Sequence, residues 1–209
     1  MTGRIIKGDG CVAEGAAWLT DRDTRFAKAL DLVGPLPLRL RSDGFEALVS
    51  AICGQQVSVA SAKAIFARLT NAGMVTPEAA LAVTTDDLRA LGLSRPKARY
   101  VHALADAQLD YAALRGAPTD TVIETLMAVP GIGKWTAEIY AMFSLGRADV
   151  FAAGDLALQE GARLVFALPE RPDDKALRVM AEDWSPWRSV AARLLWAYYA
   201  HHTSREGIR

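Results

Sequence analysis

The sequence is poor in the residues that build metal centres and disulfide frameworks. Its 209 residues include two cysteines, Cys11 and Cys53, and three histidines. A four-iron cluster takes four thiolates, and a structural zinc site takes four cysteine or histidine ligands. The cysteine content therefore excludes an iron–sulfur cluster, and the few histidines argue against zinc. We expect a protein that requires no cofactor.

The sequence also lacks a long apolar run and an excess of charge of either sign. No stretch approaches the roughly 20 apolar residues that span a bilayer, and residues 1–7 lack the apolar core of a secretory signal. With 24 basic and 24 acidic residues the net charge is zero, which argues against a protein that coats nucleic acid non-specifically. We expect a cytoplasmic monomer, made of one compact unit or two close lobes.

Strand-like alternation is scarce, and the hydrophobic pattern is helical almost throughout. Apolar residues recur at spacings of three and four in segments 45–52, 60–69, 122–126 and 139–143. Helix-start residues precede such segments, and glycine or proline separates them. The pattern predicts an all-α fold of about ten helices joined by short loops.

The most informative segment, residues 129–137, reads Val-Pro-Gly-Ile-Gly-Lys-Trp-Thr-Ala. Pro130 favours the end of one helix, because the residue before a proline is pushed out of the α region. Gly131 and Gly133 permit positive φ and the close approach of another backbone. A second helix that starts at once presents its first N–H groups outward, as an anion site suited to a nucleic-acid phosphate. Taken alone, the segment is also typical of an ordinary tight turn.

Three further segments stand around this hairpin. Residues 52–58 read Ile-Cys-Gly-Gln-Gln-Val-Ser, Asp155 follows Gly133 by 22 positions, and residues 184–189 read Trp-Ser-Pro-Trp-Arg-Ser. Together the four segments resemble the helix-hairpin-helix-Gly/Pro-Asp superfamily of DNA glycosylases, and within it the bacterial 3-methyladenine DNA glycosylase II branch. The resemblance covers roughly residues 35 to 200.

The resemblance implies one glycosylase unit, residues 1–209, made of two helical lobes. The first lobe would run from about residue 36 to 145 and contain the hairpin. The second would combine residues 1–35 with residues 146–209. The resemblance also implies a compact form, without the N-terminal sheet domain of the larger bacterial relatives.

The resemblance assigns the chemistry to Asp155. Breaking an N-glycosidic bond leaves positive charge on the deoxyribose. A carboxylate beside the anomeric carbon stabilises that charge and orients or deprotonates the attacking water. Local sequence alone favours Asp155 as the cap of the helix that follows it, and it is the hairpin at the spacing of the family that favours catalysis. Capping and catalysis are compatible.

The base pocket is assigned by resemblance to Trp135, Trp187, Ile139 and Leu156. Superfamily members that also cut the DNA strand carry a nucleophilic lysine at the position of Trp135, and Lys134 is one residue away, a turn of about 100° along a helix. We therefore expect monofunctional hydrolysis. Trp135 and Trp187 would stack on an extruded, cationic purine. Ile139 and Leu156 replace tyrosines of the best-known relatives. Core packing is an alternative role for Trp135, and it is the role expected of Trp184, Trp196, Tyr198 and Tyr199.

Duplex DNA is expected to contact the hairpin and the corner near residue 55. By resemblance, a phosphate would be held at Gly131, Gly133, Lys134 and Thr136. Gln56, with Gln55 beside it, would enter the minor groove and fill the gap left by a flipped nucleotide. Exposed glutamines at an ordinary helix corner are the alternative.

Two weaker features complete the expected DNA surface. The basic cluster Arg95, Lys97 and Arg99 forms either a solvated helix face or a small basic surface. By resemblance, a monovalent cation would be bound by the main-chain carbonyls of Met127, Val129 and Ile132.

The sequence as a whole predicts a monofunctional DNA glycosylase of base excision repair. Its substrates would be alkylated purines, 3-methyladenine and 7-methylguanine, in double-stranded DNA. One alternative is a glycosylase for mispaired or deaminated bases, which needs polar groups to read a neutral base. Another is a non-catalytic helix-hairpin-helix module that only binds DNA.

Overall fold

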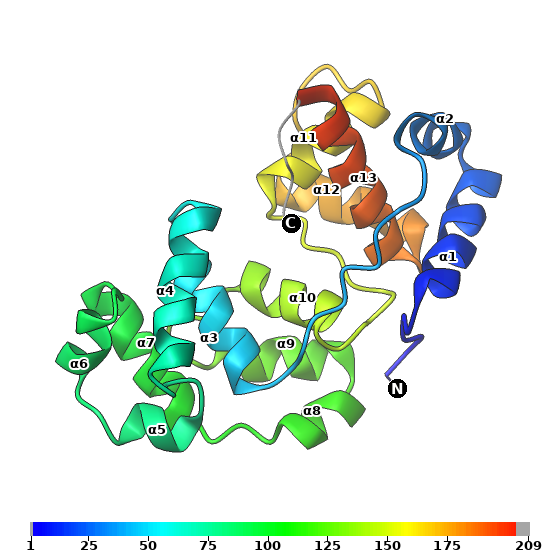
Figure 1. Ribbon diagram of the computed structural model, residues 1–209. Coiled ribbons are helices and arrows are strands. Elements are labelled where there is room, and N and C mark those ends of the chain that lie inside the picture. The colour runs from blue at the N-terminus through cyan, green and yellow to red at the C-terminus, as the bar shows by residue number, and fades with distance from the viewer. Residues whose placement is uncertain (1, 204–209) are drawn as a thin grey trace. The chain divides into compact units, whose positions relative to one another are not determined.

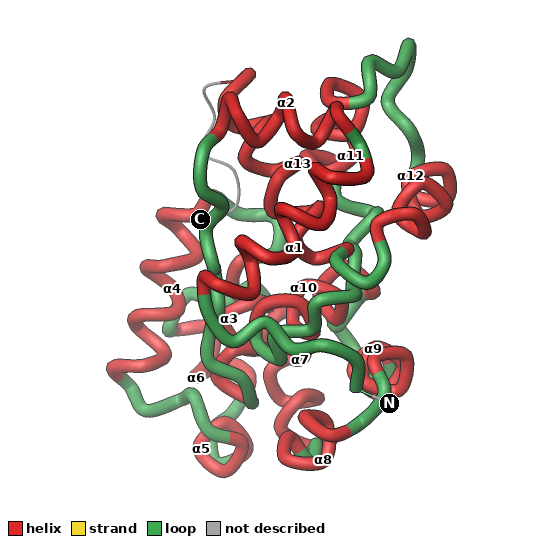
Figure 2. The backbone as a smooth tube through the Cα atoms, turned by 90° about the vertical axis from the view of Figure 1, so that its right-hand side faces the viewer, coloured by secondary structure: helices red, strands yellow, loops and turns green. Residues whose placement is uncertain are grey.

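The computed structural model describes residues 2–203 and consists of helices joined by loops (Figures 1 and 2). The elements are α1 Asp9–Arg22, α2 Thr24–Val33, α3 Phe45–Gly54, α4 Val59–Asn71, α5 Pro77–Leu81, α6 Thr85–Ala90, α7 Arg95–Asp106, α8 Tyr111–Gly116, α9 Thr119–Met127, α10 Lys134–Phe143, α11 Leu156–Val165, α12 Asp174–Met180, the 3-10 helix η1 Ala181–Trp184, and α13 Arg188–Thr203. Residues 2–203 contain no strand, and Ile5 and Arg147 form an isolated antiparallel bridge. The predicted all-α fold is confirmed.

The helices outnumber the expected ten because several are short. Helices α5, α6 and α8 have five or six residues each, which is less than two turns and too short for a period of 3.6 to be visible. Within the described range, no helix combines the length and hydropathy of a membrane span.

The chain forms two compact units. The continuous unit is Arg41–Tyr140, and the discontinuous unit combines Met1–Leu40 with Ala141–Arg209. The expected lobe boundaries, after residues 35 and 145, differ from these, and the second boundary falls inside α10. Residue 1 and residues 204–209, which the prediction placed in the second lobe, lie outside the described residues.

The core of the continuous unit lies between α3, α4 and α7. Helix α3 buries Leu48, Val49 and Ile52 completely, and it packs against both α4 and α7. Helix α7 contributes Val101 and Leu104 and also packs against the short helices α5 and α6. Burial of such side chains contributes about 1.5–3 kcal/mol each. The side chains of α3 and α7 thus form the centre of this core.

The discontinuous unit is organised around α13, which packs against α1, α2 and α11. In Figure 1 the blue N-terminal helices accordingly lie beside the red C-terminal helix. Phe26 of α2 meets Trp184 edge-on at 5.5 Å, and Trp184 stacks on Phe166 with centroids 5.6 Å apart. This aromatic cluster joins segments that are about 140 residues apart in the chain.

Arg193 is a second link between the two segments of this unit. Its guanidinium is fully buried; Nε and Nη2 donate to the carbonyl of Leu38 at 3.2 and 2.9 Å, and Nη1 donates to the carbonyl of Ser189 at 2.8 Å. Burial, with a smaller contribution from Arg39, lowers the pKa of Arg193 to about 10. The guanidinium of Arg193 therefore ties the loop that contains Leu38 to the middle of α13.

Candidate active site and DNA-binding hairpin

Asp155 occupies the N-cap position of α11, and its carboxylate is held by several donors. Its Oδ1 accepts from the main-chain N–H groups of Ala157 at 2.9 Å and Leu158 at 3.0 Å. It also accepts from the indole Nε1–H of Trp196 at 3.1 Å. The side chain is 8 % exposed. This geometry is compatible with both roles considered for Asp155. The residue caps α11, and the same hydrogen bonds hold its carboxylate in a defined orientation.

The loop before Asp155 is fixed as well. The main-chain N–H of Asp155 donates to the carbonyl of Ala152 at 2.9 Å. The side-chain amide of Gln159, one turn into α11, donates back to the carbonyl of Ala153 at 2.9 Å. Gly154 between them is exposed. The carboxylate therefore stands on a short loop whose backbone is bonded on both sides.

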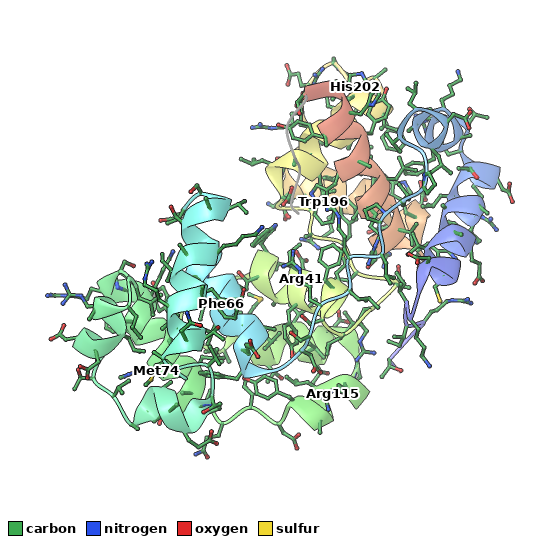
Figure 3. All side chains as sticks on the ribbon, viewed as in Figure 1. Arg41, Phe66, Met74, Arg115, Trp196 and His202 are labelled. Atoms are coloured by element: carbon green, nitrogen blue, oxygen red, sulfur yellow. The ribbon has the colours of Figure 1, made fainter. Side chains whose placement is uncertain are left out.

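Trp196 reaches Asp155 because α11 and α13 approach each other closely. At Gly161 of α11, an added Cβ would lie 2.6 Å from the carbonyl oxygen of Leu195 on α13, so only glycine fits there. Trp196, labelled in Figure 3, follows Leu195 directly and is fully buried against Phe143, with ring centroids 5.7 Å apart. Sequence reasoning placed Trp196 in the core and missed its bond to the candidate catalytic group.

A pocket opens beside the start of α11. It has a volume of about 710 Å³ and is lined by Leu156, Ala157, Glu160, Arg171, Tyr199 and Thr203. Leu156 is 63 % exposed although it is apolar. Tyr199 lies one turn after Trp196 on α13, so both face α11. Leu156, which the sequence assigned to the base pocket, lines this cavity together with Tyr199.

The hairpin of the continuous unit is a tight turn between α9 and α10. The N–H of Ile132 donates to the carbonyl of Val129 at 3.0 Å, and Gly131 has φ +91°. Proline followed by a residue of positive φ is the arrangement of a type II turn. An added Cβ on Gly131 would lie 2.2 Å from Cγ of Tyr100 on α7. Gly131 is thus required by its conformation and by its neighbour.

Gly133 differs from Gly131. An added Cβ would meet nothing within 4 Å, and its φ is not positive. Gly133 is exposed, as are Lys134 and Trp135. The first helical bond of α10 runs from Ala137 N–H to the carbonyl of Gly133, so the preceding N–H groups lie ahead of the helical ladder. A phosphate at this end of α10 stays a prediction.

The remaining hairpin residues are buried to different degrees. The side chain of Thr136 is buried at 5 % exposure, so only its main chain is placed at the end of α10. Of the predicted cation ligands, Val129 and Ile132 are buried and Met127 is 45 % exposed. The carbonyl of Val129 already accepts the Ile132 N–H. A bound cation there stays a prediction.

Gln55 and Gln56 play different parts at the corner after α3. The side-chain amide of Gln55 donates to the carbonyl of Gly131 at 2.9 Å, which ties the corner to the hairpin. Gln56 is exposed and has φ +54°, a left-handed conformation that non-glycine residues rarely adopt. Gln56 is therefore the one of the pair that is presented to solvent.

The two tryptophans assigned to the base pocket differ in solvent exposure. Trp135 is 38 % exposed and can offer a ring to a ligand. Trp187 is 3 % exposed, the guanidinium of Arg4 lies 4.7 Å from its ring centroid, and its ring packs against Gly15 of α1. This placement makes Trp187 a packing residue of the discontinuous unit. Ile139 is also buried, at 7 % exposure.

The basic cluster of α7 is not a uniformly solvated face. Arg95 and Arg99 are exposed, but Lys97 is buried at 8 % exposure. Its Nζ donates to the carbonyls of Cys53 and Gln55 at the end of α3. The expectation of a solvated or DNA-facing lysine is wrong for Lys97, because its ammonium satisfies carbonyls that the helix end leaves unpaired.

The family model described as HhH-GPD superfamily base excision DNA repair protein matches residues 49–188. The chain belongs to this superfamily. The match includes the corner at Gln55, the hairpin and Asp155, and the predicted superfamily is confirmed.

Relatives of this HhH-GPD protein carry the name expected from the sequence. DNA-3-methyladenine glycosylase 1 of Schizosaccharomyces pombe is 30% identical over 85% of this chain and 83% of its own length. The crystal structure of a DNA-3-methyladenine glycosidase from Bacillus halodurans is 35% identical, with a TM-score of 0.77 over 88% of each chain. An S. pombe 3-methyladenine DNA glycosylase solved with abasic DNA is 28% identical, with a TM-score of 0.76 over 90% of this chain and 95% of that one. The predicted enzyme class, a DNA glycosylase of the 3-methyladenine type, is confirmed.

Proposed function

We propose that this HhH-GPD protein hydrolyses the N-glycosidic bond of alkylated purines, such as 3-methyladenine and 7-methylguanine, in double-stranded DNA. The observation that carries the proposal is the carboxylate of Asp155, which three donors orient at the start of α11. The abasic DNA in the S. pombe structure supports duplex DNA as the ligand. Release of the base would leave such an abasic site as product.

The proposed chemistry needs one carboxylate and one water. The C1′–N bond breaks, its electron pair leaves with the base, and positive charge develops on the sugar ring. Asp155 stabilises that charge, and the water oxygen bonds to C1′ while its proton passes to the carboxylate or to solvent. A fixed carboxylate costs no reorganisation in the transition state. No metal or cofactor takes part in this scheme, so base release should persist in a chelator.

The proposed lesion preference follows from the chemistry of the base and from the residue types that the sequence assigned to base binding. An alkylated purine that carries positive charge leaves as a neutral base and needs no general acid. The exposed ring of Trp135 would add about 0.5–2 kcal/mol of preference for a cationic ring. Ile139 and Leu156 carry no proton to donate to a neutral base. We therefore expect 3-methyladenine and 7-methylguanine to be released faster than hypoxanthine.

Base release from duplex oligonucleotides that each carry one of these lesions tests the proposal. The wild-type protein should release the cationic bases, and Asp155→Asn should lose at least about a hundredfold in single-turnover rate while still binding abasic-site DNA. Asparagine also caps helices well, so the variant should fold.

Asp173→Asn is the matched control. Asp173 caps α12 in the same unit, through the N–H of Ala176, and should keep wild-type activity. Equal rates on hypoxanthine and 3-methyladenine would contradict the proposed preference. Binding without release of any base would favour the non-catalytic module.

A further inference from the structure

Lys97 is a buried lysine whose ammonium group donates to two main-chain carbonyls. Its Nζ donates to the carbonyl of Cys53 at 2.9 Å and to that of Gln55 at 2.6 Å. Both carbonyls lie at the C-terminal end of α3, where unpaired C=O groups carry partial negative charge. Burial lowers the pKa of the Lys97 ammonium. Burying a lysine costs free energy, and here the two hydrogen bonds to the end of α3 offset part of that cost.

Lys97 holds the residue that precedes Gln56. The carbonyl of Gln55 accepts from Lys97, and the side-chain amide of Gln55 donates to the carbonyl of Gly131 in the hairpin. Gln55 is thus fixed at its main chain by α7 and at its side chain by the α9–α10 turn. All of these residues belong to the continuous unit.

The segment that follows is strained and exposed. Gln56 has φ +54°, and a non-glycine residue keeps such a conformation only when its surroundings impose it. Val57 and Val59 beside it are 40 % and 59 % exposed. An exposed polar side chain with apolar neighbours on a fixed corner suits insertion between bases, because apolar groups stabilise contacts with unstacked bases.

We propose that Lys97 is a positioning residue for nucleotide extrusion. It fixes the corner in the conformation that presents Gln56 to the duplex, while Gln55 sets that corner against the phosphate-binding hairpin. Lys97 itself touches neither DNA nor the lesion. This inference rests on the proposed function, in which Gln56 fills the gap left by the extruded base.

Lys97→Met tests the role, since methionine keeps the apolar stem and removes the donors. The first readout needs no hydrolysis: 2-aminopurine is placed opposite an abasic site, and its fluorescence change on protein binding reports insertion of the corner. We expect this change to be lost in Lys97→Met and kept in Lys97→Arg, which retains donors. Lys28→Met, which removes an exposed lysine of α2, should behave as wild type.

The second readout separates positioning from general damage to the fold. Single-turnover release of 3-methyladenine is compared in a paired duplex and in a bulge where the lesion has no partner. Lys97→Met should lose about tenfold or more in the duplex and little in the bulge, where extrusion is already easy. In a Gln56→Ala background, Lys97→Met should add little, because both act through the same corner.

Equal losses in duplex and bulge, or full additivity with Gln56→Ala, would overturn the proposal. If Lys97→Met fails to fold, Gln55→Ala, which removes only the tie to the hairpin, should show the same duplex-selective loss. If the wild-type protein releases no base but the fluorescence change depends on Lys97, the proposed function fails and the positioning role stands.

Discussion

Asp155 and Trp196 show how much a single side chain reveals in sequence. The cap at Asp155 could be predicted, because an aspartate directly before an apolar helical segment is a typical N-cap, and its catalytic role stays a prediction. The contact of Trp196 could not be predicted, since a tryptophan in an apolar helix has the same pattern whether it fills the core or donates a bond. A physical signal did exist: a buried tryptophan usually finds a partner for its N–H. The partner, Asp155, is 41 residues away, and only the packing of α11 on α13 identifies it.

Trp196→Phe should lower the rate of base release while leaving DNA binding unchanged. Phenylalanine keeps the packing against Phe143 but removes the Nε1–H donor to Asp155. A hydrogen bond to a charged group is worth about 1.5–3 kcal/mol, so the single-turnover rate should fall about ten- to hundredfold. Trp184→Phe, in the aromatic cluster of the same unit, is the control. An unchanged rate in Trp196→Phe would show that the indole only fills space.

Trp135 and Lys134 predict the products of the reaction. The resemblance in sequence implies that Trp135 stands at the position of the nucleophilic lysine of strand-cutting superfamily members, and Lys134 is turned away from that position by about 100°. We therefore expect intact strands with abasic sites, and no covalent protein–DNA adduct after borohydride treatment. A denaturing gel with labelled oligonucleotide checks both. A band of trapped complex that survives denaturation would contradict monofunctional hydrolysis.

Among the elements, the hairpin was foreseen in more detail than any other. Proline and glycine act on the backbone directly, so the turn at residues 129–132 and the early start of α10 could be predicted from sequence. The starts of α5 and α6 are also visible in the sequence, because Thr76 and Thr84 are typical N-cap residues. The extent of α5, α6 and α8 is not, because five or six residues are too few to show a helical period. Lys97 illustrates the same limit: its spacing from Arg95 and Arg99 indicated a charged face, whereas contact with the end of α3 buries it.

Gly131→Ala and Gly133→Ala should differ, although both glycines belong to the hairpin. At Gly131 the Cβ would meet Tyr100 and the positive φ would strain alanine, at a cost of about 1–3 kcal/mol. We expect a lower thermal midpoint and weaker duplex binding. Gly133→Ala should melt as wild type, because its Cβ meets nothing within 4 Å, and should weaken only DNA binding.

Calorimetry and a binding titration with abasic-site duplex distinguish the two variants. Weakening should be the same for every DNA sequence, since phosphates carry no sequence information. An unchanged affinity of Gly133→Ala for the duplex would contradict a phosphate site at this end of α10.

For the molecule as a whole, the zero net charge constrains how it binds DNA. A balanced protein has no large basic field, so few phosphates should be neutralised on binding. Each neutralised phosphate contributes about −0.9 to the slope of log affinity against log salt. We expect a slope of roughly −2 to −4, corresponding to about two to four contacts. Titrations with labelled abasic duplex at several salt concentrations measure it, and a slope near −8 would indicate a basic surface that the sequence hides.

The division into two units could not be predicted from composition and periodicity. Composition and periodicity predict helices and say nothing of which distant helices pack together. The pairing of Phe26 with Trp184, and of Leu38 with Arg193, is a property of the folded discontinuous unit. The resemblance to a two-lobed family suggested such a division, with boundaries that differ from those in the structure.

The discontinuous unit affects the order in which the two units can fold during synthesis. During synthesis, residues 1–40 leave the ribosome before the other segment of their unit, which begins at residue 141. At roughly 5–20 residues per second, α1 and α2 wait about 8–30 s for the start of α13, roughly 150 residues after the end of α2. The continuous unit is complete in that interval and can fold. Val12, Leu19 and Phe26, which are buried in the finished protein, stay open to chaperones until α13 has been made.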